Sequence, residues 1–398
     1  MNKTIKKLLI KRFRSFPNAV VEFDNPTFFV GKNGAGKSNF ADVFGFLSES
    51  MSLPLQAVFD KRGGISVVRN RSSVRSAPPI LGIGVVFGKM NGASGGRFAF
   101  EVKAFPNYEY EVTREQCEVR CDDGTRYWYD RSKKFNSNVS GLRPALEPRA
   151  LCLPVVGGDE RFAPVLRSLS SMRVYLIEPE KLREMQDPDS GKVLRRDGSN
   201  AASVVKELER SNPDGLRRVR EILESIVPNT KSVRPKKHGN KLTLEFTQEW
   251  GLHKRLDFEA FNMSDGTLRV LGMLMAVFQF PTPSLLVIEE PEATVHPGAL
   301  GAVLDLIRHA GRITQVVVTT HSPDILDAKW IEDKNLRIVT WQEGASFIST
   351  IDETSRKVLR DHLARAGELM RANALHPDTD ALFKESSKIK EERLFEEF

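Results

Sequence analysis

The chain has little cysteine, which limits how it can be cross-linked or bind metal. Its 398 residues include only Cys117, Cys121 and Cys152. Three thiols cannot form a disulfide framework, and Cys117 and Cys121 have no second pair of ligands at zinc-site spacing. A disulfide-stapled fold and a structural zinc site are therefore excluded, and we expect a reducing, cytoplasmic environment.

Long apolar runs are missing as well. The longest, residues 270–280, is far shorter than the roughly 20 residues that a membrane-spanning helix needs. Near the N-terminus the apolar run is broken by Lys11, too early for the core of a signal peptide. The sequence also has no internal repeat and no long heptad pattern. We expect no membrane partner.

The chain has no large excess of charge of one sign. Its 59 Lys and Arg residues against 52 Asp and Glu give a formal net charge of +7. This balance permits a nucleic-acid partner without requiring one. The basic cluster of Arg234, Lys236, Lys237 and Lys241 could contact a phosphate backbone or could be a solvated loop.

What the sequence does have is a glycine-rich loop of the kind that binds phosphate. Residues 31–38 read GKNGAGKS and match the pattern GxxxxGK[ST]. They follow the apolar run 27–30 and precede apolar residues at helical spacing, so we predict a strand, a loop and a helix in that order. Loop N–H groups would bind the phosphates, Lys37 would reach the β- and γ-phosphates, and Ser38 would bind Mg²⁺.

Two further buried-strand patterns end in residues suited to hydrolysis. Residues 284–288 lead into Glu289 and Glu290, and residues 315–320 lead into His321. Parallel strands deliver active-site residues at their carboxyl ends. We predict that Glu289 holds Mg²⁺, that Glu290 polarises the attacking water as general base, and that His321 contacts the γ-phosphate. A histidine at the end of a strand can also be purely structural.

A fourth motif, FNMSDGTLRV, occupies residues 261–270 ahead of the carboxylate strand. Ser264 is a suitable helix N-cap, and Gly266 falls in the first turn. A helix N-terminus that faces solvent can bind phosphate, and the alternative is a plain helix cap. Glu292 is expected to be a loop residue with a structural role.

The order of these four motifs resembles that of the ABC-type ATPase heads of the RecF and SMC class. Within this class the chain is similar to compact bacterial AAA-family ATPases found alone or in phage-defence operons. Further similar pieces are residues 11–16, 195–200, 296–297 and 367–369, so the resemblance spans nearly the whole chain. It implies an α/β P-loop NTPase fold with a mixed central sheet, an antiparallel β lobe and a helical insertion.

Two features depart from the wider superfamily. The signature reads MSDGT where transporters carry LSGGQ, so Ser264 and Gly266 match whereas Asp265 and Thr267 do not. Glu289 stands where most members have aspartate, which adds one methylene and keeps the carboxylate. Both changes weaken the analogy to transporters.

In heads of this class, ATP lies between the phosphate loop of one subunit and the signature helix of another. The resemblance therefore implies a homodimer that binds ATP and Mg²⁺. It places Glu290 and His321 in catalysis, Ser38 and Glu289 at the metal, and Ser264, Asp265 and Gly266 in trans. The residues that it implies at ATP are Gly31, Asn33, Gly34, Ala35, Gly36, Lys37, Ser38, Asn39, Arg12 and Arg14. Arg12 and Arg14 could equally form a solvated basic edge.

We expect four segments along the chain. Residues 1–121 would form the N-terminal part of the head with the phosphate loop and the β lobe, and residues 122–240 a variable helical insertion. Residues 241–345 would complete the head, and residues 346–398 would form a C-terminal helical tail. Helices are predicted over 201–208 and 213–226, and a turn over 15–18.

The resulting hypothesis is an ATP-hydrolysing switch that controls a protein effector encoded nearby or a nucleic-acid transaction, in phage defence or DNA maintenance. A second hypothesis is an ATP-dependent nuclease or DNA-repair factor that acts directly on DNA. Few residues follow His321 and their carboxylates lack metal-site spacing, which speaks against an appended nuclease domain. A transporter motor, the third class, would need a membrane partner.

Overall fold

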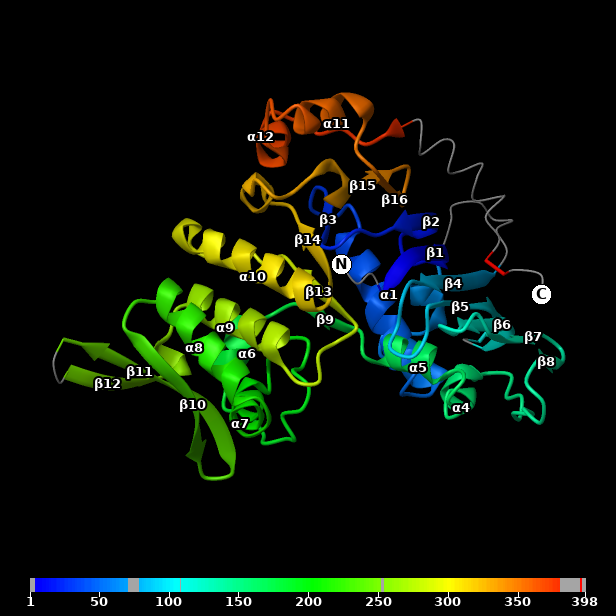
Figure 1. The fold of residues 1–398 in the computed structure, drawn as a ribbon, viewed down its shortest axis with the longest axis horizontal. Helices are drawn as coiled ribbons and strands as arrows, with labels where there is room; N and C mark the ends of the chain where they lie inside the picture. The colour runs from blue at the N-terminus through cyan, green and yellow to red at the C-terminus, as the bar shows by residue number, and fades with distance from the viewer. Residues whose placement is uncertain (1–3, 71–78, 108, 252–253, 380–393, 396–398) are drawn as a thin grey trace.

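The computed structural model describes residues 4–70, 79–107, 109–251, 254–379 and 394–395. Two large sheets lie side by side, and a helical region with a third, small sheet extends from the opposite side of the central sheet (Figure 1). In the described part of the chain, no helix is both long and apolar enough to cross a bilayer.

The central sheet has six strands in the order β16, β15, β3, β14, β13, β9. Among them, β15 and β16 pair antiparallel and the other neighbours are parallel, so the sheet is mixed as predicted. The strands are β3 (Thr27–Val30), β9 (Arg173–Tyr175), β13 (Leu285–Glu289), β14 (Gln315–Thr320), β15 (Leu336–Gln342) and β16 (Ala345–Ser349). All residues of β3, β13 and β14 are buried, because helices or other layers cover both faces of the sheet.

Alternate residues of β13 face two different hydrophobic cores. Leu285 and Val287 belong to the core that contains α1 (Lys37–Ser50) and the antiparallel sheet. Leu286 and Ile288 belong to the core that contains α9 (Asp265–Phe278) and α10 (Leu300–Ile313). The period of two along a strand thus divides the apolar run between the two sides of the sheet.

The antiparallel β lobe has seven strands in the order β2, β1, β4, β5, β6, β7, β8. They are β1 (Ile5–Phe13), β2 (Phe16–Glu22), β4 (Ile80–Phe87), β5 (Gly95–Ala104), β6 (Tyr110–Arg120), β7 (Arg126–Arg131) and β8 (Phe135–Ser137). Phe13 pairs with Phe16, so the first turn is Arg14-Ser15, and the turn predicted over 15–18 is wrong.

Two strands of the predicted insertion 122–240 belong to the β lobe, because β7 and β8 continue its sheet beyond Cys121. A third, β9, pairs with β13 in the central sheet. Within this stretch, helix α8 (Pro213–Ile226) has the predicted bounds, and α7 (Ala201–Ser211) extends past its predicted end. The division into four segments stays a prediction.

The basic cluster lies on two strands and not in a loop. Arg234, Lys236 and Lys237 fall on β10 (Thr230–His238), the edge of a three-stranded sheet with β11 (Lys241–Trp250) and β12 (Lys254–Glu259), and Lys241 begins β11. Pro235 in β10 is tolerated because proline is compatible with an edge strand.

The chain past the central sheet forms helices α11 (Glu353–Arg360) and α12 (Ala366–Arg371). The remaining short helices are α2 (Leu55–Asp60), α3 (Ile65–Val68), α4 (Leu153–Val156), α5 (Ala163–Ser170), α6 (Pro179–Arg183), η1 (Ala260–Asn262), η2 (Pro297–Ala299), η3 (Pro323–Asp327) and η4 (Asp333–Asn335).

Candidate functional site

The phosphate loop connects β3 to α1, as predicted. Gly36 is the N-cap of α1 with a φ of 107°, a backbone conformation that favours glycine. A Cβ atom at Gly31 would lie 2.3 Å from the Val339 carbonyl oxygen, and one at Gly36 would lie 2.2 Å from Ser346 Oγ. The loop therefore needs glycine at both positions to approach β15 and β16. Gly34 is exposed and faces outward.

Side chains behind the loop hold it in place. Ser346 Oγ lies 2.7 Å from the Ala35 carbonyl oxygen and 2.8 Å from Ser15 Oγ. Asn39, which the sequence placed at ATP, donates its side-chain amide to Ser15 Oγ at 2.9 Å. The Asn39 amide thus supports the loop from the turn between β1 and β2. Asn33 and Ser38 are exposed on the loop's open side.

Lys37 is buried inside the loop. Its Nζ donates to the carbonyl oxygens of Gly31 at 2.8 Å and Lys32 at 3.1 Å. Burial lowers the pKa of Lys37, and the charges of Glu290 and Glu292 act in the opposite direction. The ammonium group therefore lies within the electrostatic reach of both carboxylates that follow β13.

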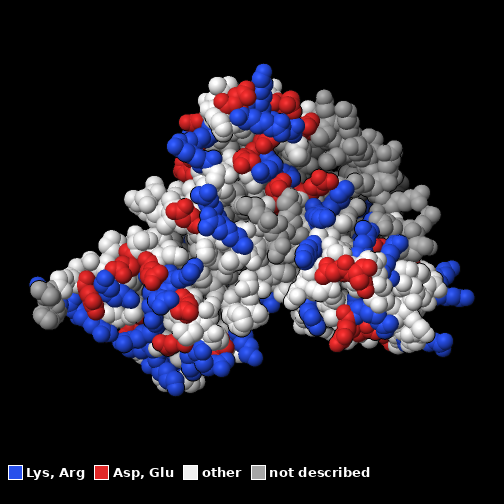
Figure 2. Space-filling model, viewed as in Figure 1, with Lys and Arg blue, Asp and Glu red and all other residues white. Residues whose placement is uncertain are grey.

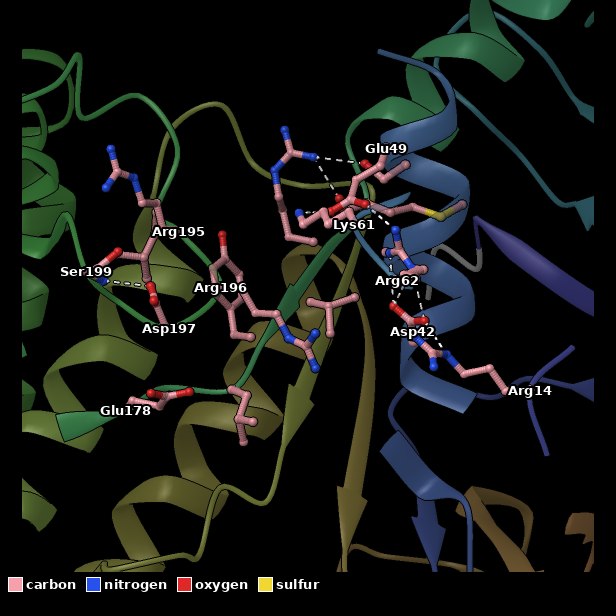
Figure 3. Close-up of a pocket in the computed structure, with 18 residues that line it drawn as sticks. Arg14, Asp42, Glu49, Lys61, Arg62, Glu178, Arg195, Arg196, Asp197 and Ser199 are labelled. Carbon is pink, nitrogen blue, oxygen red and sulfur yellow. Dashed lines mark hydrogen bonds and ion pairs between the residues drawn. The ribbon is translucent and has the colours of Figure 1, made fainter. Parts of the chain in front are cut away.

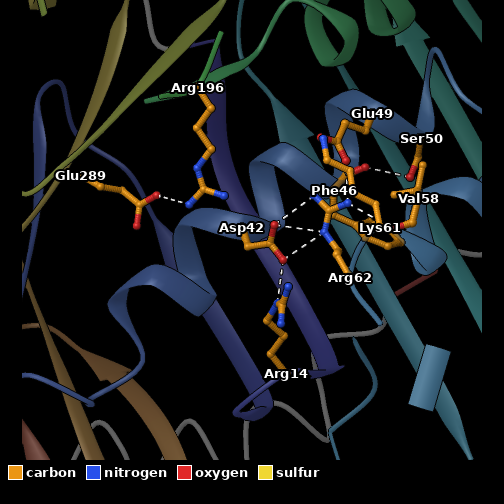
Figure 4. A network of polar contacts seen from close by, with 10 residues as sticks. All are labelled: Arg14, Asp42, Phe46, Glu49, Ser50, Val58, Lys61, Arg62, Arg196 and Glu289. Carbon is orange, nitrogen blue, oxygen red and sulfur yellow. Dashed lines mark hydrogen bonds and ion pairs between the residues drawn. The ribbon is translucent and has the colours of Figure 1, made fainter. Parts of the chain in front are cut away.

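Glu289 ends β13 with its side chain almost fully buried. Its Oε1 accepts a hydrogen bond from Arg196 Nη2 at 2.6 Å, and its Oε2 is buried without a hydrogen-bond partner among the described residues (Figure 4). Burial raises the pKa of Glu289, against the opposing effects of Arg196 and the Ser38 hydroxyl. A carboxylate oxygen with free coordination capacity beside a serine hydroxyl fits Mg²⁺, which prefers such oxygen donors.

Glu290 begins the loop after β13 in a left-handed conformation, with a φ of 46°. Its backbone N–H donates to the Thr319 carbonyl oxygen at 2.9 Å, and its carbonyl oxygen accepts from Arg269 Nη1 at 3.1 Å. These bonds fix the turn that directs the half-exposed carboxylate away from the strand. Strained backbone of this kind is common at functional sites.

Glu292 contributes more to this site than the sequence indicated. Its Oε1 accepts from Thr320 Oγ1 at 2.6 Å and from the His321 N–H at 3.2 Å. His321 Nδ1 lies 3.7 Å from a carboxylate oxygen of both Glu290 and Glu292. Glu292 therefore anchors the end of β14 and orients the predicted switch histidine. Nothing in the sequence around residues 284–292 indicates that Glu292 bonds to the end of β14.

The carboxyl ends of β3, β13 and β14 meet because the three strands are in register. Thr320 pairs with Val30, and Thr319 pairs with Glu289. The parallel pairing places the phosphate loop, the two glutamates and His321 at one edge of the sheet. The structure thus brings together three of the four predicted motifs.

The fourth motif opens helix α9. Ser264 is its N-cap and accepts from the Thr267 N–H at 3.2 Å, and Asp265 forms an ion pair with Arg183 of α6. A Cβ atom at Gly266 would lie 2.9 Å from the Thr294 carbonyl oxygen, so glycine is needed for close contact with the loop after β13. Ser264 is exposed at the helix N-terminus, and its hydroxyl bonds to Thr267 of the same helix.

Arg12 and Arg14 lie at the end of β1 and in the turn that follows it. Arg14 Nε donates to Asp42 Oδ2 on α1 at 2.6 Å, and Arg62 binds the same carboxylate at 2.9 Å (Figure 4). The Arg14 guanidinium is therefore held against the second turn of α1. The role of both arginines at ATP stays a prediction.

A cavity of about 780 Å³ separates α1 from residues 173–199. Asp42 and Arg62 line one wall, and Arg195, Arg196 and Asp197 line the other (Figure 3). The Arg196 side chain crosses from its wall toward Glu289 (Figure 4). The cavity thus opens beside the proposed metal position.

Most residues of the basic cluster form ion pairs with nearby carboxylates. Arg234 and Lys236 both pair with Glu245, at 2.6 and 2.7 Å, and Lys236 also pairs with Glu259 at 2.9 Å. Lys241 pairs with Asp187 at 2.6 Å. Lysine and arginine seen from one side of the molecule alternate with acidic residues over this region (Figure 2). These pairs reduce the charge available to a nucleic-acid backbone.

The arrangement of these elements defines the class of the protein. A phosphate loop, a strand ending in paired glutamates and a strand ending in histidine share one sheet edge, next to an antiparallel lobe and a signature helix. This arrangement is the P-loop α/β fold that solved SMC head domains also have.

The family model described as "AAA domain, putative AbiEii toxin, Type IV TA system" matches residues 27–327, and the chain belongs to this family. Among curated proteins none matches. An SMC head bound to the C-terminal winged-helix domain of ScpA is 17% identical with a TM-score of 0.55, covering 89% of this chain and 99% of that one. An SMC head with an extended coiled coil from Pyrococcus furiosus, bound to the C-terminal domain of ScpA, is 15% identical with a TM-score of 0.53, covering 91% and 100%. At these identities the likeness establishes the fold.

Proposed function

We propose that the protein binds and hydrolyses ATP as a homodimeric switch. The observation that carries this proposal is the convergence of Lys37, Glu289, Glu290 and His321 at one edge of the central sheet, with Ser38 beside Glu289. Phosphoryl transfer depends mainly on positioning and on stabilising negative charge, and this edge supplies both.

Each residue has a distinct task in the proposed reaction. The N–H groups of the loop and of the first turn of α1 bind the β-phosphate, and Lys37 turns from the loop carbonyls to the phosphates. Glu290 accepts a proton from the attacking water, and His321, held by Glu292, contacts the γ-phosphate. Ser38 and Glu289 would hold Mg²⁺, which neutralises charge on the phosphate oxygens.

A second copy of the chain completes the site. The signature helix begins at an exposed Ser264, whose hydroxyl bonds to Thr267 of the same helix, whereas the phosphate loop is supported by Ser15 and Ser346. Each protomer therefore offers a phosphate loop on one surface and the positive end of α9 on another. Two copies placed head to tail would trap two ATP molecules, with Ser264 and Gly266 at each γ-phosphate in trans.

The output of the switch is proposed to be control of a protein effector, in phage defence or DNA maintenance. The family description names an AbiEii-type toxin of a toxin–antitoxin system. The structurally similar SMC heads are bound to ScpA domains, which shows that this fold can carry a protein partner. ATP hydrolysis would then separate the two protomers and change which of their surfaces are accessible to the effector.

The test is a Glu290→Gln variant studied by light scattering with ATP and Mg²⁺. Glutamine keeps the shape of the side chain and cannot take the proton, so the ATP-bound dimer should accumulate at twice the 44.7 kDa chain mass. Adding Lys37→Ala to this variant should return the mass to that of the monomer. A mass that stays at 44.7 kDa with saturating ATP would contradict the proposed dimer. Cleavage of plasmid DNA by the native protein with Mg²⁺ would instead support the nuclease hypothesis.

A further inference from the structure

The outer face of the β lobe contains a strip without side chains. Along β4, Leu81, Ile83 and Val85 point into the core shared with α1, so Gly82 and Gly84 between them face the opposite side of the sheet. In the neighbouring strand, Ala99 pairs with Gly84. These three small residues, Gly82, Gly84 and Ala99, form what we name the glycine strip.

Apolar atoms around the glycine strip are covered even though they lie outside both cores. Leu9 pairs with Gly84 from the other side and is 6% exposed, and Ala99 is 0% exposed. Neither residue belongs to the two hydrophobic clusters that flank the central sheet. The outer face of the β lobe is therefore occupied at this position.

The occupant includes Leu394, near the C-terminal end of the chain. A Cβ atom added to Gly82 would lie 2.5 Å from Leu394 Cδ2, and one added to Gly84 would lie 2.9 Å from Leu394 Cδ1. The leucine side chain thus rests directly on the backbone of β4, where any residue other than glycine would displace it. In Figure 1 this short red segment lies beside the β lobe.

Two arginines on the same face hold the residues of this segment. Arg97 Nη2 on β5 donates to the Leu394 carbonyl oxygen at 2.8 Å. The Arg114 guanidinium on β6 lies 4.6 Å from the centre of the Phe395 ring, within the range of a cation–π contact. Asp130 on β7 pairs with Arg114 at 2.5 Å and fixes its position. Leu394 and Phe395 are therefore held by three kinds of contact: apolar packing of the leucine, a hydrogen bond to its carbonyl oxygen and a cation–π contact with the phenylalanine ring.

We propose that the glycine strip, with Arg97 and Arg114, is a peptide-docking site that recognises a Leu-Phe pair, and that Leu394 and Phe395 of the chain itself occupy it within the same molecule. The glycines leave room for the leucine side chain, Arg97 donates a hydrogen bond to the peptide backbone, and Arg114 contacts the aromatic ring. The surface holds the Leu-Phe pair by side-chain contacts and one backbone contact, without strand pairing to this pair.

The experiment measures binding of a fluorescent peptide with the sequence of residues 390–398, by anisotropy. Full-length protein with Leu394→Ala and Phe395→Ala leaves the site open, so it should bind the peptide at least tenfold more tightly than the native chain does. A peptide with the same two alanines is the matched ligand control and should not bind. Adding Arg114→Ala or Gly84→Val to the open protein should weaken binding at least fivefold.

Each outcome decides the proposal. Equal binding by the native and open proteins, or no binding by either, would overturn it. An ATP-independent dimer of the native chain that the double alanine change dissolves would show that the tail docks between two molecules, which contradicts docking within one. If the Arg114→Ala and Gly84→Val proteins both melt at the native temperature and still bind the peptide, the peptide binds at another site, which contradicts the proposal. The assay contains no nucleotide, so its result is independent of the proposed ATPase function.

Discussion

Replacing Arg196 by alanine should increase the affinity of the nucleotide site for Mg²⁺. Arg196 donates at 2.6 Å to Oε1 of the Glu289 carboxylate, which is proposed to hold the metal, so the guanidinium and the ion compete for the negative charge of the same carboxylate. The Arg196 side chain is 50% exposed and that of Glu289 is 1% exposed. Without the arginine, the buried Glu289 carboxylate loses a neighbouring positive charge, so its interaction with a bound Mg²⁺ becomes more favourable.

The size of the effect follows from this contact. A hydrogen bond to a charged group contributes about 1.5–3 kcal/mol. Solvent screening of the half-exposed arginine reduces this to about 1–2 kcal/mol. We therefore expect the half-saturating Mg²⁺ concentration for nucleotide binding to fall about 5- to 30-fold, since each 1.4 kcal/mol is tenfold.

The assay is calorimetric titration of a non-hydrolysable ATP analogue over a series of Mg²⁺ concentrations, repeated with Mn²⁺ and detected by electron paramagnetic resonance. Arg195→Ala is the matched control, because Arg195 is 52% exposed and pairs with Asp189 at 3.1 Å. It removes the same charge from the neighbouring position. An unchanged or higher half-saturating Mg²⁺ concentration in Arg196→Ala, or an equal fall in Arg195→Ala, would refute the competition between Arg196 and the metal.

Two further predictions concern the loop and the switch. Gly36→Ala should lower the melting temperature more than Gly34→Ala does. Both glycines have a positive φ, but only at Gly36 would the new Cβ lie 2.2 Å from Ser346 Oγ. Equal shifts of the melting temperature would show that the structure relieves this contact at no cost. Glu292→Gln should keep the affinity for ATP within about threefold of the native value and lower the ATPase rate at least tenfold, because it weakens the bonds that orient His321. A native ATPase rate in a phosphate-release assay would show that Glu292 has no role in hydrolysis.

The phosphate loop, the glutamate pair and the strand-terminal histidine could be predicted because each is a local pattern. The pattern GxxxxGK[ST] of residues 31–38 is itself specific, and burial on both faces of the sheet gives the apolar runs 285–288 in β13 and 316–318 in β14. The role of Glu292 could not be predicted in the same way. It depends on the parallel pairing of β13 with β14, which brings Thr320 and His321 to a residue 28 positions earlier in the chain.

Other features were missed because they depend on distant partners. The basic residues of β10 look like a loop in sequence, whereas they form a strand that pairs with β11, where Glu245 of β11 and Glu259 of β12 offset their charge. β9 is only three residues long and gains its place in the sheet by pairing with β13. The Leu394 contact requires two glycines some 300 residues away, and nothing near Leu394 in the sequence indicates them.

The division of β13 between two cores also limits how its glutamates can vary in position. A slip of one residue would send Leu286 toward the α1 side and Leu285 toward the opposite side, and would turn the Glu289 side chain to the wrong face. Both lobes would have to repack at once for such a shift to persist. Packing on both sides of the central sheet therefore fixes the spacing between the Glu289 carboxylate and the phosphate loop.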